Sequence, residues 1–457
     1  MRRILLLSLC LKGAGAALEL ILQVMLTRMI GMDGYGHYTA WINCADLIFW
    51  CLFSGIVKCN IFYLSSGGCS IRSFRNRYYA WYIIPIVLAA AAIGTVLFGI
   101  TFLPVPLIAA AELLMSDSSS ALLAQGSYPV SLSGEYVAGR MILAAGIFVM
   151  SSAGALTLRN LLWLYFFQYM AVFLCFSFFT GKDREKRDIS EEISLGKWAG
   201  FQRADIMQAM IGQVPVLLQF FFAGAFETGV LGIIALVRKV VNFISGPAAK
   251  VYLPEFSRKY KEGDRESLPV IFASIMRIQM LFVGPMAVLL VGYPELLLSV
   301  FSKDLLPYSS LFAGCSGVFL FAASLGPCGG VLQMTENEKT DNRCRETAVI
   351  LMCLVFAVFH RRKMFAVFGI CIQTLTEAAG KFVMLCRIWG RLPEPFFKYI
   401  SRWAAPGILI LAARVFRLQY SWATMIGMCG AAFLLQLAEE QRLRIRGRKE
   451  EKGRREL

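Results

Sequence analysis

Residues 206–226 read IMQAMIGQVPVLLQFFFAGAF, a run of twenty-one positions without a charged side chain. A helix of about 20 mostly apolar residues is long enough to cross the hydrocarbon core of a bilayer. Five other stretches are free or nearly free of charge in the same way. They are 78–100, 141–158, 161–180, 305–335 and 418–438. The chain is therefore expected to contain several transmembrane helices.

Further apolar segments, which contain charges or are short, extend this pattern. Six are long enough to span although they carry internal charges: 5–27, 38–64, 102–125, 229–251, 268–292 and 364–385. The runs 348–359 and 403–413 would span only by recruiting their polar flanks or by tilting less. We predict an all-α polytopic membrane protein with roughly twelve to fourteen transmembrane helices in two pseudo-symmetric bundles around a central cavity.

The composition agrees with a membrane protein and excludes a secreted disulfide scaffold. Hydrophobic residues make up 57% of the 457 positions and charged residues 17%, whereas soluble domains have about 45–50% and about 25%. The 13 cysteines lie mostly singly inside apolar runs, where they behave as small core residues. Cysteine usage therefore does not indicate a disulfide framework.

Membrane topology explains the net charge of +16. With the N-terminus inside, Lys and Arg gather in the loops that face the cytoplasm, as the positive-inside rule requires. We expect both termini to be cytoplasmic, and we expect no nucleic-acid partner. The run Arg361-Arg362-Lys363 breaks the rule, so the topology around 348–363 stays open.

The longest polar interior segment divides the chain into parts. We predict an N-terminal six-helix bundle over 1–180, a cytoplasmic linker over 181–203 and a second-half bundle core over 204–335. Further transmembrane helices would follow over 336–438. The basic residues of 439–457 would form a cytoplasmic tail that faces anionic lipid headgroups.

Two short glycine motifs indicate an internal repeat. Gly31-Met-Asp-Gly-Tyr-Gly36 and Gly224-Ala-Phe-Glu-Thr-Gly229 are 193 positions apart, and each has two glycines five apart with an acidic residue between them. Such repeats are typical of transporters in which two halves rock about a site near the bilayer midplane. The copies start six spans apart, so they begin in the same orientation in the membrane. The axis that relates them should therefore lie along the membrane normal.

These motifs also carry a family resemblance. Lys12-Gly13, Leu26-Thr-Arg28-Met-Ile-Gly31 and Gly34-Tyr-Gly36-His-Tyr38 resemble the opening of the bacterial polysaccharide-biosynthesis membrane proteins. These proteins are oligosaccharide flippases of the multidrug/oligosaccharidyl-lipid/polysaccharide exporter superfamily. Leu253-Pro254-Glu-Phe-Ser-Arg-Lys-Tyr-Lys-Glu-Gly-Asp-Arg265 is similar to a loop of the same family. The motif residues taken from the resemblance are Gly31, Gly34, Gly36, Gly224, Gly229 and Pro254.

Ionisable side chains inside the apolar segments are the candidate functional residues, because a charge in hydrocarbon is costly and usually faces a cavity. Candidate residues of a substrate cavity are Lys12, Arg28, Asp46, Arg238, Lys239 and Arg277. Candidate coupling or paired charges are Glu19, Glu112, Asp117, Glu377 and Lys381. Glu377 and Lys381 are four apart, so an alternative is that they simply pair on one helix face.

The repeat suggests one specific pairing. Asp46 and Lys239 correspond under the 193-residue offset, so opposite charges would face each other across the pseudo-twofold axis. The acids could serve as H+ or Na+ sites that reset the transporter, and the sequence does not choose between ion-coupled and uncoupled cycles.

Several classes of chemistry are not indicated. No loop is long enough for a catalytic domain, and no G-x-x-x-x-G-K-[ST] element that would bind ATP is present. The two histidines, His37 and His360, are far apart in sequence and lack a second ligand at metal spacing. We therefore expect no enzymatic activity, no metal and no cofactor.

The resemblance implies a flippase or exporter in the bacterial cytoplasmic membrane. Its substrate would be an undecaprenyl-diphosphate-linked oligosaccharide or a related polysaccharide precursor, moved by alternating access. Membrane lipids and a glycan polymerase or glycosyltransferase of the same pathway would be partners. Two alternatives stay open: a drug or cation antiporter of the same superfamily, and a flippase for a lipid II-type peptidoglycan precursor.

Overall fold

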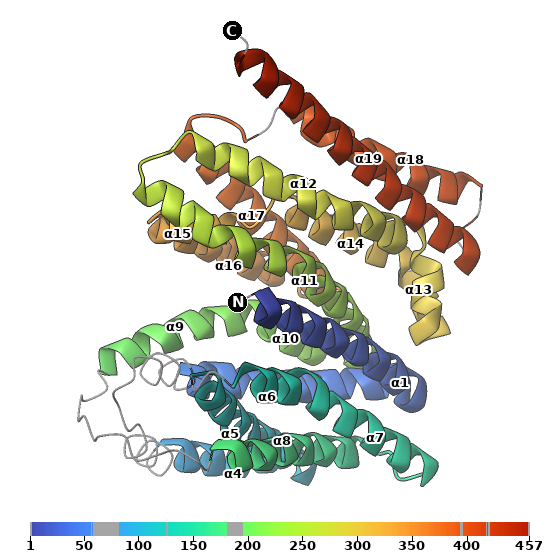
Figure 1. Ribbon diagram of the computed structural model, residues 1–457. Coiled ribbons are helices and arrows are strands. Elements are labelled where there is room, and N and C mark those ends of the chain that lie inside the picture. The colour runs from blue at the N-terminus through green and yellow to red at the C-terminus, as the bar shows by residue number, and fades with distance from the viewer. Residues whose placement is uncertain are drawn as a thin grey trace. The chain divides into compact units, whose positions relative to one another are not determined.

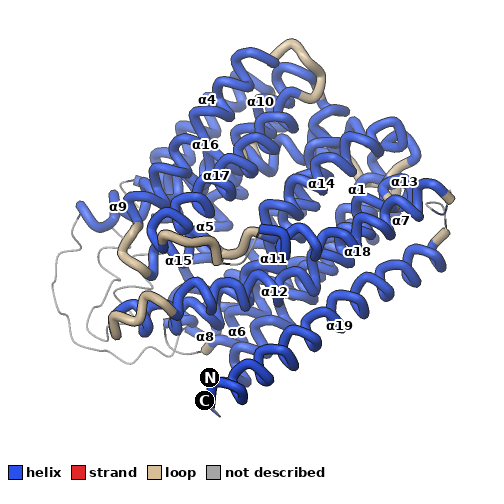
Figure 2. The backbone as a smooth tube through the Cα atoms, turned by 90° about the horizontal axis from the view of Figure 1, so that it is seen from above, coloured by secondary structure: helices blue, strands red, loops and turns tan. Residues whose placement is uncertain are grey.

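The computed structural model describes residues 2–55, 57, 82–124, 127–180, 195–393, 396–416, 418 and 421–455. Every regular element in these ranges is a helix, as predicted (Figure 2). The chain forms two compact units, unit 1 over Met1–Gly232 and unit 2 over Ile233–Leu457 (Figure 1). The boundary falls inside the long helix α11 (Ala225–Lys261).

Unit 1 is built from helices that precede the unit boundary. They are α1 (Arg2–Ile48), η1 (Phe49–Phe53), α4 (Ile84–Phe98), η3 (Ile100–Phe102), α5 (Pro104–Ala124), α6 (Tyr128–Ser133), η4 (Gly134–Ala138), α7 (Gly139–Ser152), α8 (Leu158–Thr180), α9 (Leu195–Gly212) and α10 (Val214–Ala223). Helices α5 and α8 share an apolar core that includes Leu122 and Phe176.

Unit 2 continues from α11 to the C-terminus. Its other helices are α12 (Ser267–Ala287), η5 (Val288–Gly292), α13 (Pro294–Phe301), η6 (Lys303–Tyr308), α14 (Ser309–Ser324), α15 (Cys328–Met334), α16 (Glu338–Phe359), α17 (Phe365–Trp389), α18 (Phe396–Val415) and α19 (Trp422–Arg455). Phe256, Phe272 and Leu385 from α11, α12 and α17 share its core.

The helices confirm a multi-pass membrane protein. Within the described residues, nine helical segments are long and apolar enough to cross a bilayer, and the first contains both halves of α1. Large apolar side chains point outward from several helices: Val96 and Phe178 are each 85% exposed. Lipid, unlike water, makes such a surface favourable. The number of spans stays a prediction.

Two expected segments have different bounds in the structure. The expected stretch 141–158 corresponds to a helical segment that runs from Tyr128 to Ser152, and this segment therefore includes Glu135 and Arg140. The stretch 305–335 is not one helix, because Gly326 takes φ 87° and Pro327 follows it, which ends α14 before α15 begins.

The short apolar runs recruit polar flanks. The run 348–359 lies in α16, which starts ten residues earlier at Glu338, and 403–413 lies in α18. α19 likewise continues without a break through 439–455, where a separate tail was expected. Helix length is therefore set by more than the apolar run. The predicted domain boundaries stay predictions, and 181–194 of the linker lie outside the described residues.

The two glycine motifs adopt the same backbone conformation. Gly31 has φ 70° and ψ 174°, and Gly224 has φ 106° and ψ −179°. This region of φ/ψ space is essentially restricted to glycine. Each glycine separates two helices: Gly31 breaks α1, and Gly224 separates α10 from α11. The conserved geometry at positions 193 apart supports the predicted repeat.

The second glycines of the motifs contact each other's copy reciprocally. A Cβ on Gly36 would lie 1.7 Å from the carbonyl oxygen of Ala225, and a Cβ on Gly229 would lie 2.8 Å from that of Met32. Ala225 and Met32 are themselves 193 positions apart. Residue i of one copy thus meets residue j of the other and vice versa, as a twofold relation requires.

Candidate functional site

A π-helical segment in unit 1 places a cation beside α1. The wider turns of η4 (Gly134–Ala138) interrupt the regular hydrogen bonding between α6 and α7, a feature frequent at functional positions. Arg140, just after it, donates from Nη1 to the carbonyl oxygens of Glu135 and Tyr136 at 3.0 and 3.4 Å. Gly15 of α1 leaves room for Tyr136, whose carbonyl oxygen would lie 2.6 Å from a Cβ there.

Two predicted residues of α1 face this segment. Arg140 Nε donates to Glu19 Oε2 at 3.1 Å, and the Lys12 ammonium lies 5.2 Å from the centroid of the Tyr136 ring, a cation–π distance. Lys12 and Glu19 therefore share one face of α1, as their spacing of seven predicts. The carboxylate predicted for coupling is paired with a cation.

Arg140 was missed by the sequence analysis. It immediately precedes the apolar run 141–158, where the positive-inside rule predicts a cation that flanks a span on the cytoplasmic side. The structure places it inside a continuous helical segment, where it ion-pairs with Glu19. Nothing in the sequence around Arg140 distinguishes it from an ordinary cation at the end of a transmembrane helix.

We predict a modest stability cost when this pair is broken. In Glu19→Gln, Arg140 keeps its backbone carbonyl partners but loses the ionic one. The side chains of Arg140 and Glu19 are 30% and 24% exposed. A loss of about 1 kcal/mol in the free energy of unfolding is expected. Denaturant unfolding in detergent measures it, with Asp33→Asn at an exposed position of the same helix as control. Equal effects of the two variants would contradict the pairing.

Other predicted acids of unit 1 lie on α5. Among the described residues, Glu112 Oε2 is buried without a hydrogen-bond partner, and Asp46 and Glu135 are its electrostatic neighbours. Ser119 donates to Glu135 Oε2 at 3.3 Å. Asp117 is also buried. The structure thus gathers carboxylates from α1, α5 and η4 in this unit.

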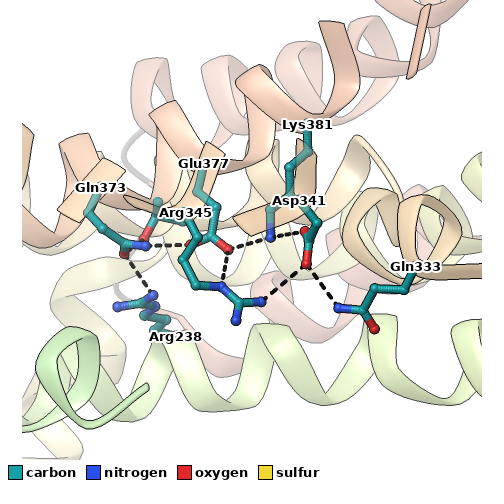
Figure 3. A network of polar contacts seen from close by, with 8 residues as sticks. Arg238, Gln333, Asp341, Arg345, Gln373, Glu377 and Lys381 are labelled. Carbon is teal, nitrogen blue, oxygen red and sulfur yellow. Dashed lines mark hydrogen bonds and ion pairs between the residues drawn. The ribbon is translucent and has the colours of Figure 1, made fainter. Parts of the chain in front are cut away.

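Unit 2 contains a connected polar network. It consists of Arg238, Gln333, Asp341, Arg345, Gln373, Glu377 and Lys381, from α11, α15, α16 and α17 (Figure 3). We refer to these seven residues as the unit 2 network. Its members come from four helices, so it ties together segments that are far apart in sequence.

The centre of the unit 2 network is Lys381. Its ammonium lies 2.7 Å from Asp341 Oδ1 and 2.6 Å from Glu377 Oε1, so the predicted Glu377–Lys381 pair is present. The Arg345 guanidinium bridges the same two carboxylates at 3.6 Å each. Gln333 Nε2 donates to Asp341 Oδ2 at 2.9 Å. Asp341 is 1% exposed.

Arg238 joins the unit 2 network through a neutral amide. It donates from Nη2 to Gln373 Oε1 at 2.9 Å, and Gln373 Nε2 donates to Glu377 Oε2 at 2.5 Å. The amide is therefore oriented from both sides. Within the described residues, Arg238 forms no direct ion pair with a carboxylate. Glu377 acts on this positive charge electrostatically, and hydrogen bonds connect the two side chains through the Gln373 amide.

Three further predicted cavity residues, Lys239, Arg28 and Arg277, are not members of the unit 2 network. Lys239 is exposed on α11, and Arg28 is exposed on α1. Arg277 donates to Ala273 O at 3.2 Å and to Ser274 Oγ at 3.4 Å, both on its own helix. Asp46 and Lys239 belong to different units, so their facing each other stays a prediction.

The family loop motif lies at the end of α11. The side chain of Pro254 is outside the described residues. In the last turn of α11, Lys259 Nζ lies 3.0 Å from Oδ2 of Asp264, which follows the helix. This hydrogen bond holds the pKa of Asp264 below its usual value. Gly263 takes φ 78° in the turn. The motif is therefore a structural connection between α11 and α12.

Comparisons with known proteins identify the fold. The sequence matches no protein-family model and no curated protein sequence. Its structure is similar to that of the lipid II flippase MurJ in an inward closed conformation, with a TM-score of 0.71 and 12% identity. The similarity covers 96% of this chain and 100% of that one. The predicted polytopic helical fold is confirmed.

Two further solved structures are more distant. The eukaryotic MATE transporter AtDTX14 gives a TM-score of 0.49 at 13% identity, covering 84% of this chain and 95% of that one. An outward-facing multidrug resistance MATE transporter of the MOP superfamily gives 0.42 at 12% identity, covering 82% and 88%. All three are transport proteins.

Proposed function

We propose that this protein is a flippase or exporter of the bacterial cytoplasmic membrane, with both termini in the cytoplasm. It moves an undecaprenyl-diphosphate-linked oligosaccharide, or a related polysaccharide precursor, from the cytoplasmic to the outer leaflet by alternating access. It is not an enzyme. Membrane lipids and a polymerase or glycosyltransferase of the same pathway are its partners.

The observation that carries this proposal is the set of contacts made by the Arg238 guanidinium. A guanidinium in the membrane-embedded part of a helix bundle is costly unless it is compensated. Here it is held by the amide of Gln373 and has no direct carboxylate partner among the described residues. A diphosphate supplies the missing negative charge, and guanidinium groups bind phosphate oxygens in bidentate geometry. The fold shared with a lipid II flippase supports the same class of substrate.

The test is transbilayer movement of a polyprenyl-diphosphate oligosaccharide in liposomes that contain the purified protein. Arg238→Ala is expected to lower the rate at least about tenfold, because losing one charged hydrogen bond to the phosphate costs about 1.5–3 kcal/mol. The double variant with Lys239→Ala tests the predicted second cation. Arg343→Ala, at an exposed position of α16, is the matched control and should retain the wild-type rate.

Other results would redirect the assignment. A wild-type rate in folded Arg238→Ala would remove this residue from the substrate path. Movement of lipid II in preference to other oligosaccharide lipids would favour the narrower peptidoglycan-precursor function, which the shared fold with MurJ supports. No lipid movement, combined with drug efflux under an imposed ion gradient, would favour the antiporter.

A further inference from the structure

The carboxylates of α16 and α17 are neutralised from within the chain. Asp341 and Glu377 bring two negative charges, and Lys381 and Arg345 bring two positive ones. The ammonium makes the short contacts, at 2.6–2.7 Å, whereas the guanidinium is 3.6 Å away. Lys381 is therefore the principal counter-charge of both acids.

The surroundings leave little space at the ammonium. The Lys381 side chain is 8% exposed and that of Asp341 is 1% exposed. On α15, a Cβ on Gly329 would lie 2.9 Å from Asp341 Oδ1 and 3.1 Å from Lys381 Nζ. The backbone at this glycine therefore approaches both charged groups, and α15 packs close against the ion pair.

We infer that Lys381 is a tethered cation, whose ammonium holds the position that a dissociable monovalent cation would occupy between Asp341 and Glu377. If the ammonium were removed, Arg345 would be the one cation among the described residues in direct contact with the two carboxylates, because Arg238 reaches Glu377 only through a neutral amide. These three directly contacting groups would carry a net charge of −1. One alkali cation would restore neutrality, whereas a divalent cation would overcompensate. The inference concerns the charge balance of unit 2 and does not depend on which substrate is transported.

A tethered cation has a consequence for energy coupling. A side-chain ammonium cannot leave with an ion gradient, so this carboxylate pair cannot exchange Na+ between the two sides of the membrane. The contacts of Lys381 instead hold α16 and α17 together through a cation that is covalently part of the chain. On this inference Glu377 and Lys381 do not form a Na+-coupling site, and a dissociable alkali cation would bind elsewhere.

The experiment uses the full chain purified in detergent. We measure the melting temperature of the wild type and of Lys381→Ala in NaCl, LiCl, KCl and choline chloride at equal ionic strength. The wild type is expected to melt at the same temperature in all four salts. Lys381→Ala is expected to melt lower in choline chloride and to be restored by a saturable upward shift with Na+ or Li+. Lys339→Ala, at an exposed position of α16, should show neither effect.

The opposite outcomes are equally definite. If Lys381→Ala folds but its melting temperature is the same in all four salts, the vacated position does not accept a cation and the inference is wrong. If Lys381→Ala does not fold, equilibrium binding of radioactive sodium to the wild type decides. Sodium binding that is lost in Asp341→Asn would overturn the inference, whereas no such binding would support it.

Discussion

Gly36→Ala is expected to be the most damaging single-methyl change in unit 1. The added Cβ would lie 1.7 Å from the carbonyl oxygen of Ala225, well inside van der Waals contact. Because the obstacle is backbone rather than a flexible side chain, α1 and the start of α11 must separate. Overpacking typically costs about 1–3 kcal/mol, and a rigid backbone clash should reach or exceed the upper end of that range.

The measurement is the yield of monodisperse protein and its melting temperature in detergent. Gly13→Ala is the matched control: it lies on the same helix with no atom within 4 Å of the added Cβ, so it should be neutral or slightly stabilising. Gly229→Ala, with its nearest contact at 2.8 Å, should fall between the two. Wild-type stability in Gly36→Ala would show that the two motif copies do not approach as described.

Much of the fold could be predicted from hydrophobic runs, because the bilayer imposes a minimum length on each spanning helix. The runs did not predict where helices begin. The run 348–359 lies in a helix that starts at Glu338. The first part of 141–158 lies in a segment that starts at Tyr128 and ends at Ser152. Charged residues can enter these helices because partners on neighbouring helices neutralise them.

The candidate site was predicted where both partners lie on one helix. The Glu377–Lys381 spacing of four predicts their contact, and the contact is present. Asp341 and Arg345 have the same spacing and are also paired, but they precede the apolar run 348–359 and were not among the candidate residues. Applying the i,i+4 criterion to polar flanks would have found them. Arg140 pairs with Glu19 over 121 positions, and nothing in the sequence indicates which distant residues meet.

The internal repeat could also be predicted only in part from the sequence. The spacing of Gly31-x-x-x-x-Gly36 and Gly224-x-x-x-x-Gly229 reveals two copies of one motif. Their backbone conformations agree with this. The reciprocal approach of Gly36 to Ala225 and of Gly229 to Met32 can be seen only in the tertiary structure. A glycine in the sequence does not indicate which residue packs against it.

Asp341→Ala is expected to destabilise unit 2 by about 3–5 kcal/mol, the usual cost of removing one partner from a buried ion pair. Asp341 is buried and contacts Lys381 at 2.7 Å. Without it, the remaining Glu377 carboxylate faces two cations, and one positive charge is left uncompensated. Gln333 also loses its acceptor. Equilibrium unfolding in denaturant measures the loss.

Two comparisons separate the ion pair from a general effect of the substitution. Glu346→Ala removes an acid from an exposed position of the same helix, and it should change stability by less than about 0.5 kcal/mol. The double variant Asp341→Ala/Lys381→Met removes both charges together, so it should be less destabilised than the sum of the single variants, by about 1–3 kcal/mol. Strict additivity would show that Asp341 and Lys381 do not stabilise each other. Recovery in the double variant would locate the cost of Asp341→Ala in the unpaired ammonium, because an apolar pair leaves no buried charge in need of a partner.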